Sequence, residues 1–299
     1  MRRIVVSRCA LVLAIACIAL CSCRRDRRAE STPELIRDLQ SQKPFRWRAT
    51  AARILGERKD ARAVPILIAT LKTDDLDQVG VSAAVALGRI KDPRAVVPLT
   101  GSLADFNPLL REAAARSLGE LKDSRAVGPL VAAMKSGNKE AGPALAQIGD
   151  PAVEPLIDGL RDADTRGPAA EALATIGKPA ASQLIEAFKT YSGDSRLAVV
   201  QALAQINSPE VEQTLSAALQ DGNVRLAAVA YKFLLRTKTP DAQDLLVKAL
   251  REYGDLYMAE EFLVSGKPQL RIAAQNWARE NSYPIEVVQS ASPSRGSGR

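Results

Sequence analysis

Histidine is absent from this chain of 299 residues, and cysteine and aromatic residues are scarce. Without histidine there is no Ser-His-Asp or Cys-His catalytic arrangement, no His-liganded metal site and no histidine pH switch. The four cysteines all lie within the first 23 residues, so the remainder forms neither a disulfide nor a thiolate metal site. Aromatic residues make up only 4% of the chain, which predicts a core of small aliphatic side chains. We therefore expect a protein that is not an enzyme and that holds neither metal nor cofactor.

An excess of one charge sign is also missing from the body of the chain, although the whole chain has a net charge of +7. Residues 31–290 contain 32 basic and 32 acidic residues, so the basic excess belongs to the two ends. A nucleic-acid-binding protein needs a basic stripe on its folded surface. The charge balance therefore predicts that nucleic acid is not a partner.

The amino-terminal segment has the pattern of a bacterial export signal. Three arginines flank or precede an apolar run of 15 residues, 9–23, which is shorter than the about 20 residues of a membrane-spanning helix. The run ends in Leu20-Cys21-Ser22-Cys23, which resembles the signal of bacterial lipoproteins. The resemblance implies that residues 1–22 are a signal peptide and that Cys23 is lipidated. An ordinary cleaved signal and a short uncleaved anchor are the alternatives.

Residues 23–30 are expected to form a basic linker next to this anchor. Its arginines are Arg24, Arg25, Arg27 and Arg28. Basic groups near an anionic membrane contribute about 1 kcal/mol each, so these arginines are candidates for contact with the membrane surface. The expected location is the cell envelope, lipid-anchored to a bacterial membrane. In a Gram-negative cell this would be the outer membrane, on its periplasmic side.

The rest of the chain repeats a pattern of about 30 residues. An anchor leucine recurs eight times, preceded four positions earlier by alanine or valine and followed in six copies by glycine or alanine. The anchors are Leu55, Leu87, Leu118, Leu145, Leu173, Leu203, Leu234 and Leu263. Positions minus four, zero and plus three share one face of a helix, so each copy predicts a closely packed helix, here called helix B.

A turn and a second helix, called helix A, are predicted after helix B. Asp60, Asp92, Asp123 and Asp150 mark the turn as N-caps, with proline directly after two of them. A further proline five or six residues past each aspartate predicts a kink early in helix A. These prolines are Pro65, Pro98, Pro129 and Pro155.

The repeated segment, as in AAVALGRIKDPRAVVPL, resembles the HEAT-like repeats of phycobilin lyases. The resemblance implies an all-α fold, a right-handed α-α superhelix (HEAT-like solenoid) of about eight two-helix repeats over residues 31–286. Seven of the twelve aromatic residues lie beyond residue 230, which predicts a bulky carboxyl-terminal cap or an aromatic contact patch. Residues 287–299 are small and polar and are expected to be a disordered tail.

The resemblance also suggests roles for two sets of polar residues. Arginines seven positions before the anchor are expected to pair with the turn aspartates of neighbouring repeats, in a structural ladder. They are Arg48, Arg111, Arg166 and Arg196. Exposed B-helix positions two before or after the anchor are expected on the concave surface, as partner-binding candidates or a solvated face. The candidates are Arg53, Arg89, Arg116, Gln147, Gln201, Gln205, Lys232 and Arg236.

Together these patterns predict an exported, lipid-anchored, non-catalytic scaffold that binds an unknown protein partner at the cell envelope. The alternative is a HEAT-like enzyme subunit of the bilin-lyase type in the cytosol. Deoxyhypusine hydroxylase resembles this architecture, but it binds iron through His-Glu pairs that this chain lacks. Processing of the amino-terminal signal would discriminate between the two predictions.

Overall fold

Every regular element is a helix in the computed structural model, which describes residues 30–72, 78–237 and 239–283. The predicted signal peptide, the lipidation site, the four linker arginines and the tail lie outside these residues. Among the described helices, none combines the length and the apolar character that a membrane crossing requires. The chain divides into two compact units, residues 1–155 and 156–299, which we call the amino-terminal and carboxyl-terminal units. The all-α, HEAT-like fold prediction is confirmed.

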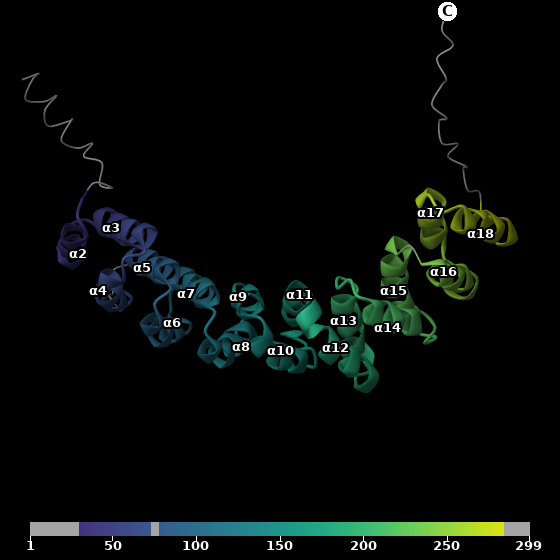
Figure 1. Cartoon of the computed structure of the whole chain (residues 1–299), viewed down its shortest axis with the longest axis horizontal. Helices are drawn as coiled ribbons and strands as arrows, with labels where there is room; N and C mark the ends of the chain where they lie inside the picture. The colour runs from purple at the N-terminus through teal and green to yellow at the C-terminus, as the bar shows by residue number, and fades with distance from the viewer. Residues whose placement is uncertain (1–29, 73–77, 238, 284–299) are drawn as a thin grey trace, which may run out of the picture. The chain divides into compact units, whose positions relative to one another are not determined.

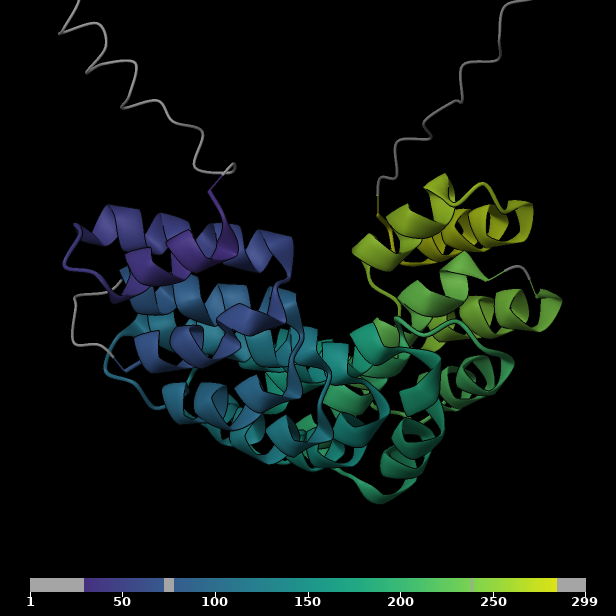
Figure 2. The ribbon, with the colours of Figure 1, turned by 60° about the vertical axis from the view of Figure 1, so that its left-hand side comes forward.

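The amino-terminal unit has two layers of helices (Figures 1 and 2). Its B helices are α3 (Phe45–Arg58), α5 (Gln78–Ile90), α7 (Pro108–Leu121) and α9 (Ala141–Ile148). The other layer holds α2 (Thr32–Gln40), α4 (Val64–Thr70), α6 (Val96–Ser102) and α8 (Val127–Lys135), while α10 (Val153–Gly159) spans the division between the units. Helices α3, α5 and α7 each pack on the B helix that follows, and all four B helices pack on the A helix before them.

The carboxyl-terminal unit continues the same alternation. Its B helices are α11 (Arg166–Ile176), α13 (Gly193–Leu203), α15 (Val224–Arg236) and α17 (Leu256–Val264). Its A helices are α12 (Lys178–Thr190), α14 (Pro209–Leu219), α16 (Pro240–Tyr253) and α18 (Pro268–Glu280). All eight predicted B helices are therefore present, each at the predicted place in the chain.

The anchor leucines form the core of the repeats. The first seven are fully buried, and so is the residue four positions before each of them. The last repeat differs, because Phe262 is fully buried while Leu263 is only half-buried. The predicted frame of that repeat is therefore off by one residue: the larger Phe262 ring fills the core and meets Tyr231 edge-on at 6.4 Å between ring centroids. The plus-three position is buried as predicted at Ile148 and Ile206, but Ile90 and Leu121 are only half-buried.

Glycine after the anchor lets neighbouring B helices approach closely in the amino-terminal unit. A Cβ atom on Gly56 would lie 2.6 Å from the Cα of Ala86, inside the contact limit of any real side chain. A Cβ on Gly88 would lie 2.8 Å from the Cβ of Ser117, and one on Gly119 would meet the next helix in the same way. The predicted role of the small residue is confirmed, because only glycine leaves room for this backbone approach.

The turns after α3, α5 and α7 share one construction. A lysine with positive φ ends each helix (Lys59 53°, Lys91 61°, Lys122 55°). The following aspartate caps a short 3₁₀ helix, η2 (Ala61–Ala63), η3 (Pro93–Ala95) or η4 (Ser124–Ala126), by accepting the backbone N–H two residues on. In the fourth repeat Gly149 takes the cap position and Asp150 lies inside η5 (Asp150–Ala152).

The predicted kinks in the A helices are wrong. Helix A begins only after the 3₁₀ turn, so the later proline falls in its first turn: Pro65 is the second residue of α4, and Pro98 is the third residue of α6. Backbone N–H groups in a first turn have no acceptor within the helix. Proline therefore costs no hydrogen bond at these positions and helps to start the helix instead of bending it.

Candidate functional site

The predicted partner-binding row is divided between the two units. Arg53, Arg89, Arg116 and Gln147 belong to the amino-terminal unit, and Gln201, Gln205, Lys232 and Arg236 belong to the carboxyl-terminal unit. All eight side chains are exposed on B helices or directly after them, as predicted. Their contacts differ between the two units. In the amino-terminal unit the arginines are paired with carboxylates, and in the carboxyl-terminal unit two of the residues line a cavity.

In the amino-terminal unit the arginines of the row are paired with carboxylates. Arg53 forms an ion pair with Glu57 one turn later on α3, and Arg89 of α5 approaches the same carboxylate to 4.0 Å. Arg116 of α7 reaches Glu140 before α9 with two hydrogen bonds of 2.8 and 3.2 Å. Exposed pairs of this kind contribute little to stability. They cover the B-helix surface with mutually neutralised charge rather than with a single-sign binding patch.

The turn aspartates form ion pairs within their own repeat, which corrects the predicted ladder. The Arg94 guanidinium binds the Asp92 carboxylate at 2.7 and 2.9 Å, and Asp60 and Asp123 are bound in the same way by the arginine two residues on. These side-chain hydrogen bonds hold the pKa of all three carboxyls below the usual range. The 3₁₀ turn folds each arginine back onto its own aspartate, so no arginine of a neighbouring repeat is needed.

The predicted ladder exists in another form in the carboxyl-terminal unit. Arg196 donates to the carbonyl of Phe188 at 3.0 Å and forms an ion pair with Asp221 of the next turn at 2.9 Å. Arg166 donates to the carbonyl of Leu160 at 3.1 Å and lies 3.9 Å from Asp194. These arginines tie loops of adjacent repeats together, as predicted, and their role is structural.

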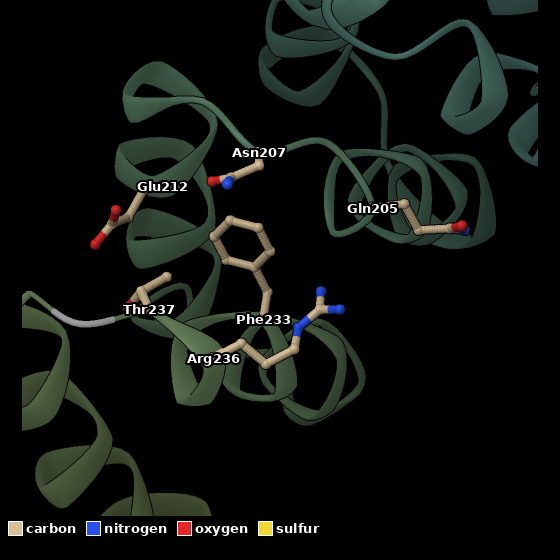
Figure 3. Close-up of a pocket in the computed structure, with 6 residues that line it drawn as sticks. All are labelled: Gln205, Asn207, Glu212, Phe233, Arg236 and Thr237. Atoms are coloured by element: carbon tan, nitrogen blue, oxygen red, sulfur yellow. The ribbon is translucent and has the colours of Figure 1, made fainter.

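A cavity of about 470 Å³ opens in the carboxyl-terminal unit, where α13, α14 and α15 meet. Its lining residues are Gln205, Asn207, Glu212, Phe233, Arg236 and Thr237. Figure 3 shows the Phe233 ring between the Asn207 amide on one side and the Arg236 side chain on the other, with Glu212 across the ring from Arg236. We call this the Phe233 cavity. It combines an aromatic surface with a cation, an anion and amide groups.

Hydrogen bonds from the surrounding helices fix the walls of the Phe233 cavity. Arg236 donates from Nη2 to the carbonyl of Ala204 at 2.8 Å, which joins the end of α15 to the end of α13. Thr239 donates its hydroxyl to Glu212 of α14. Lys267 donates from Nζ to the carbonyls of Leu235 at 2.7 Å and Thr237 at 2.5 Å, and burial lowers its pKa. The charged groups of the cavity are therefore held by the solenoid and are not free to collapse on each other.

The structure brings together two of the predicted residues, Gln205 and Arg236. Lys232 lies outside the cavity, with its ammonium 5.0 Å from the centroid of the Tyr257 ring. Phe233 is one of the late aromatic residues for which a contact patch was an open alternative. Sequence reasoning missed Asn207 and Glu212, because they belong to a loop and to an A helix, outside the anchor period. Within the ranges that the structure covers, no cluster of three or more His, Cys, Asp or Glu side chains could hold a metal ion.

Comparison with known families identifies the fold. A family model for HEAT repeats matches residues 74–142 and 181–261, about half of the chain. The chain belongs to the HEAT repeat family. A second model, PBS lyase HEAT-like repeat, matches residues 47–73 and 139–162. A search of curated proteins found no match.

The match to the lyase model corrects the prediction that the protein is not an enzyme. That prediction depended on the missing histidine and on the absence of any recognisable catalytic motif. The matched segments cover helix B, the turn and helix A of the first and of the fourth repeat, and the model is named for a lyase. Absence of histidine excludes the arrangements that need it but does not exclude other chemistry in this family.

Several solved structures are similar to this chain. Phycocyanin lyase CpcE/CpcF from Nostoc sp. PCC7120 is 24% identical over 84% of this chain and 94% of its own, with a TM-score of 0.38. Human deoxyhypusine hydroxylase is 19% identical, with coverage of 84% and 96% and a TM-score of 0.34. The archaeal HEAT-like repeats protein from Thermococcus onnurineus NA1 is 16% identical, with the same two coverages and a TM-score of 0.34. None of these likenesses bears on what this chain binds.

Proposed function

We propose that this HEAT repeat protein is exported, is held at the cell envelope by a lipid on Cys23, and binds an extended segment of a protein partner in the Phe233 cavity. The observation that carries the binding proposal is the lining of that cavity, with Arg236 and Glu212 on opposite sides of the Phe233 ring. A volume of about 470 Å³ falls within the usual range of ligand pockets.

The groups in the cavity suit a peptide better than a small anion or cation. The amides of Gln205 and Asn207 offer donors and acceptors of the kind that pair with peptide N–H and C=O groups. Arg236 and Glu212 offer contacts of opposite sign for charged side chains, and aromatic rings and arginines are frequent anchors at protein interfaces. Solenoids bind partners along surfaces built from successive repeats, as α13, α14 and α15 are here.

The proposed location is supported by the amino-terminal sequence. The basic start, the short apolar run and the Leu20 to Cys23 segment resemble a lipoprotein signal, in which Leu20, Ser22 and Cys23 fit and Cys21 departs from the usual residue. Replacing Cys23 with serine should release the protein from membranes or stall its processing, as fractionation and mass spectrometry would show. A variant that is processed and partitions like the native chain would contradict lipidation at Cys23. Ser22→Ala, which keeps a small residue before the cysteine, is the matched control.

The second candidate function is a subunit of a HEAT-like lyase. The observation in its favour is the match of residues 47–73 and 139–162 to the PBS lyase model. Such a subunit in the cytosol would keep residues 1–22. Mass spectrometry of the protein from cells therefore separates the two functions, because the exported form begins at Cys23 and carries acyl chains.

The binding proposal is tested by site-specific photo-crosslinking in envelope membranes, with the crosslinker at Thr237 on the rim of the cavity. Arg236→Gln and Asn207→Ala should each reduce the crosslinked product, while Arg271→Gln on exposed α18 should leave it unchanged. Because Arg236 also bonds Ala204, circular dichroism must show that its variant is folded. Equal crosslinking in all three variants would mean that the partner binds elsewhere.

A further inference from the structure

The corner between α2 and α3, residues 41–48, is an exposed surface that the proposed function does not use. It presents two large apolar side chains to solvent, Phe45 with 43% of its surface exposed and Trp47 with 44%. Lys43 and Arg46 are exposed beside them, and the Arg46 guanidinium lies 5.8 Å from the centroid of the Phe45 ring. Aromatic rings interleaved with basic side chains therefore gather at one corner of the amino-terminal unit.

The charge of this corner has one sign. Residues 39–56 contain four basic residues and no acidic residue, although the solenoid as a whole is balanced. Asp38 near the end of α2 forms an ion pair with Lys43. Arg46, Phe45 and Trp47 are all exposed, so the corner offers positive charge together with apolar surface.

The position of the corner fits the anchor. Residue 30 lies at the opposite end of α3, because Arg58 donates to the carbonyl of Glu30 at 2.5 Å. With 14 residues, α3 is about 21 Å long. The seven peptide units from Cys23 to Glu30 reach at most about 25 Å. A lipid on Cys23 can therefore lie under either end of α3, including the end that carries Phe45 and Trp47.

We propose that the α2–α3 corner is a second membrane contact, in which Phe45 and Trp47 enter the headgroup region of an anionic lipid surface. Arg46 and Lys43 then meet the lipid phosphates. The indole ring of Trp47 favours this depth because it is apolar except for its N–H group, and the apolar Phe45 ring adds buried area beside it. Long basic side chains extend to the same level. The inference rests on the proposed lipid anchor, which brings the corner to the bilayer.

The two tryptophans of the chain make the test direct. The full chain with Trp277→Phe keeps Trp47 as its only tryptophan, and Trp47→Phe keeps Trp277 on α18. Each variant is added to vesicles of phosphatidylglycerol or of phosphatidylcholine that contain brominated lipid. We expect bromine to quench Trp47 in the anionic vesicles, and Trp277 to stay unquenched.

Two charge variants in the Trp277→Phe background identify the role of Arg46. Arg46→Gln and Lys59→Gln each remove one exposed positive charge, at opposite ends of α3. Arg46→Gln should lower the ratio of membrane-bound to unbound protein, as measured by Trp47 quenching, about fivefold. Lys59→Gln should leave this ratio unchanged. Added salt should weaken the quenching, because screening shortens the reach of each charge. Circular dichroism confirms that both variants are folded.

The outcomes separate this inference from the proposed anchor. Membrane partition that depends on Cys23, with Trp47 unquenched, would overturn the corner contact and leave the anchor standing. Quenching of Trp47 that persists in the full-length Cys23→Ser variant would support the corner whatever becomes of the anchor. Equal quenching in phosphatidylcholine, or equal loss in Arg46→Gln and Lys59→Gln, would contradict an anionic lipid surface recognised through Arg46. Trp47 unquenched in both kinds of vesicle would favour a protein at this corner.

Discussion

The two units build the same helical repeat with different contacts between helices. In the amino-terminal unit the B helices pack mainly on each other, through Gly56, Gly88 and Gly119. In the carboxyl-terminal unit the corresponding positions are Ala174, Ala204 and the larger Leu235 and Val264, and α15 packs more extensively on the A helices beside it than on α13. The Phe233 cavity opens in this second unit. The difference teaches that glycine after the anchor lets neighbouring B helices pack closely. The cavity lies in the unit where larger residues take that position.

The largest expected effect tests whether the anchor leucines contribute equally to the cores of the two units despite this difference. Leu118 and Leu203, one anchor from each unit, are both fully buried. Changing either one to alanine should lower the free energy of unfolding by about 2–5 kcal/mol, because lost burial and a new cavity add together. Urea denaturation of the two variants measures this. Leu109→Ala, at a position 58% exposed, is the control and should cost under about 0.5 kcal/mol. If Leu203→Ala lost much less unfolding free energy than Leu118→Ala, the two units would differ in how their cores are packed as well as in their B-helix contacts.

The glycine contact itself should give the next largest effect. A Cβ on Gly88 would lie 2.8 Å from the Cβ and 2.9 Å from the Cα of Ser117, whose hydroxyl bonds the Ala84 carbonyl at 2.8 Å. Gly88→Ala should therefore destabilise by about 1–3 kcal/mol through overpacking. Gly101→Ala on α6 meets no atom within 4 Å and should stabilise by about 0.5–1 kcal/mol. If thermal melts showed both variants stabilised, close packing of the B layer would not be what distinguishes this unit.

The smallest expected effect concerns the capped turns of the amino-terminal unit. Hydrogen bonds from Arg94 lower the pKa of Asp92 in the folded state. Stabilisation from such a carboxylate is present above its unfolded pKa, near 4, and is lost as the pH falls through the lower folded pKa. Asp92→Asn keeps a good capping residue but loses the ion pair with Arg94, so it should cost at most about 1 kcal/mol at pH 7 and should reduce the loss of stability between pH 5 and pH 2.

Urea midpoints measured across that pH range test this expectation. Asp244→Asn, at an exposed position on α16, serves as the control and should leave the pH curve unchanged. If Asp92→Asn keeps the full acid loss of the native chain, the capped turns do not account for it.

Much of this fold could be predicted from the sequence because the same pattern of residues on one helix face occurs eight times. The anchors and the alanines before them specify the B helices, so these could be predicted residue by residue. The prediction failed where a single residue competes with the period, as Phe262 does beside Leu263. It also failed for Pro65 and Pro98, because the recurring Asp-x-Arg-Ala pattern does not distinguish a 3₁₀ turn from the first turn of helix A. Gln205 and Arg236 of the cavity lie on B-helix positions and could be predicted, but Asn207 and Glu212 could not.

The lysines with positive φ and the aspartates that cap the 3₁₀ helices have a consequence for protein engineering. Lys59-Asp60 and Lys91-Asp92 reverse the chain in the same way and are 32 residues apart, so they act as matching cut sites. Deletion of residues 61–92 would join Asp60 to Pro93 and restore the Asp-Pro-Arg-Ala junction that η3 has now. Gly56 would then face Ser117, as Gly88 does at present. The first part of the molecule can therefore be shortened by one whole module without any new type of junction.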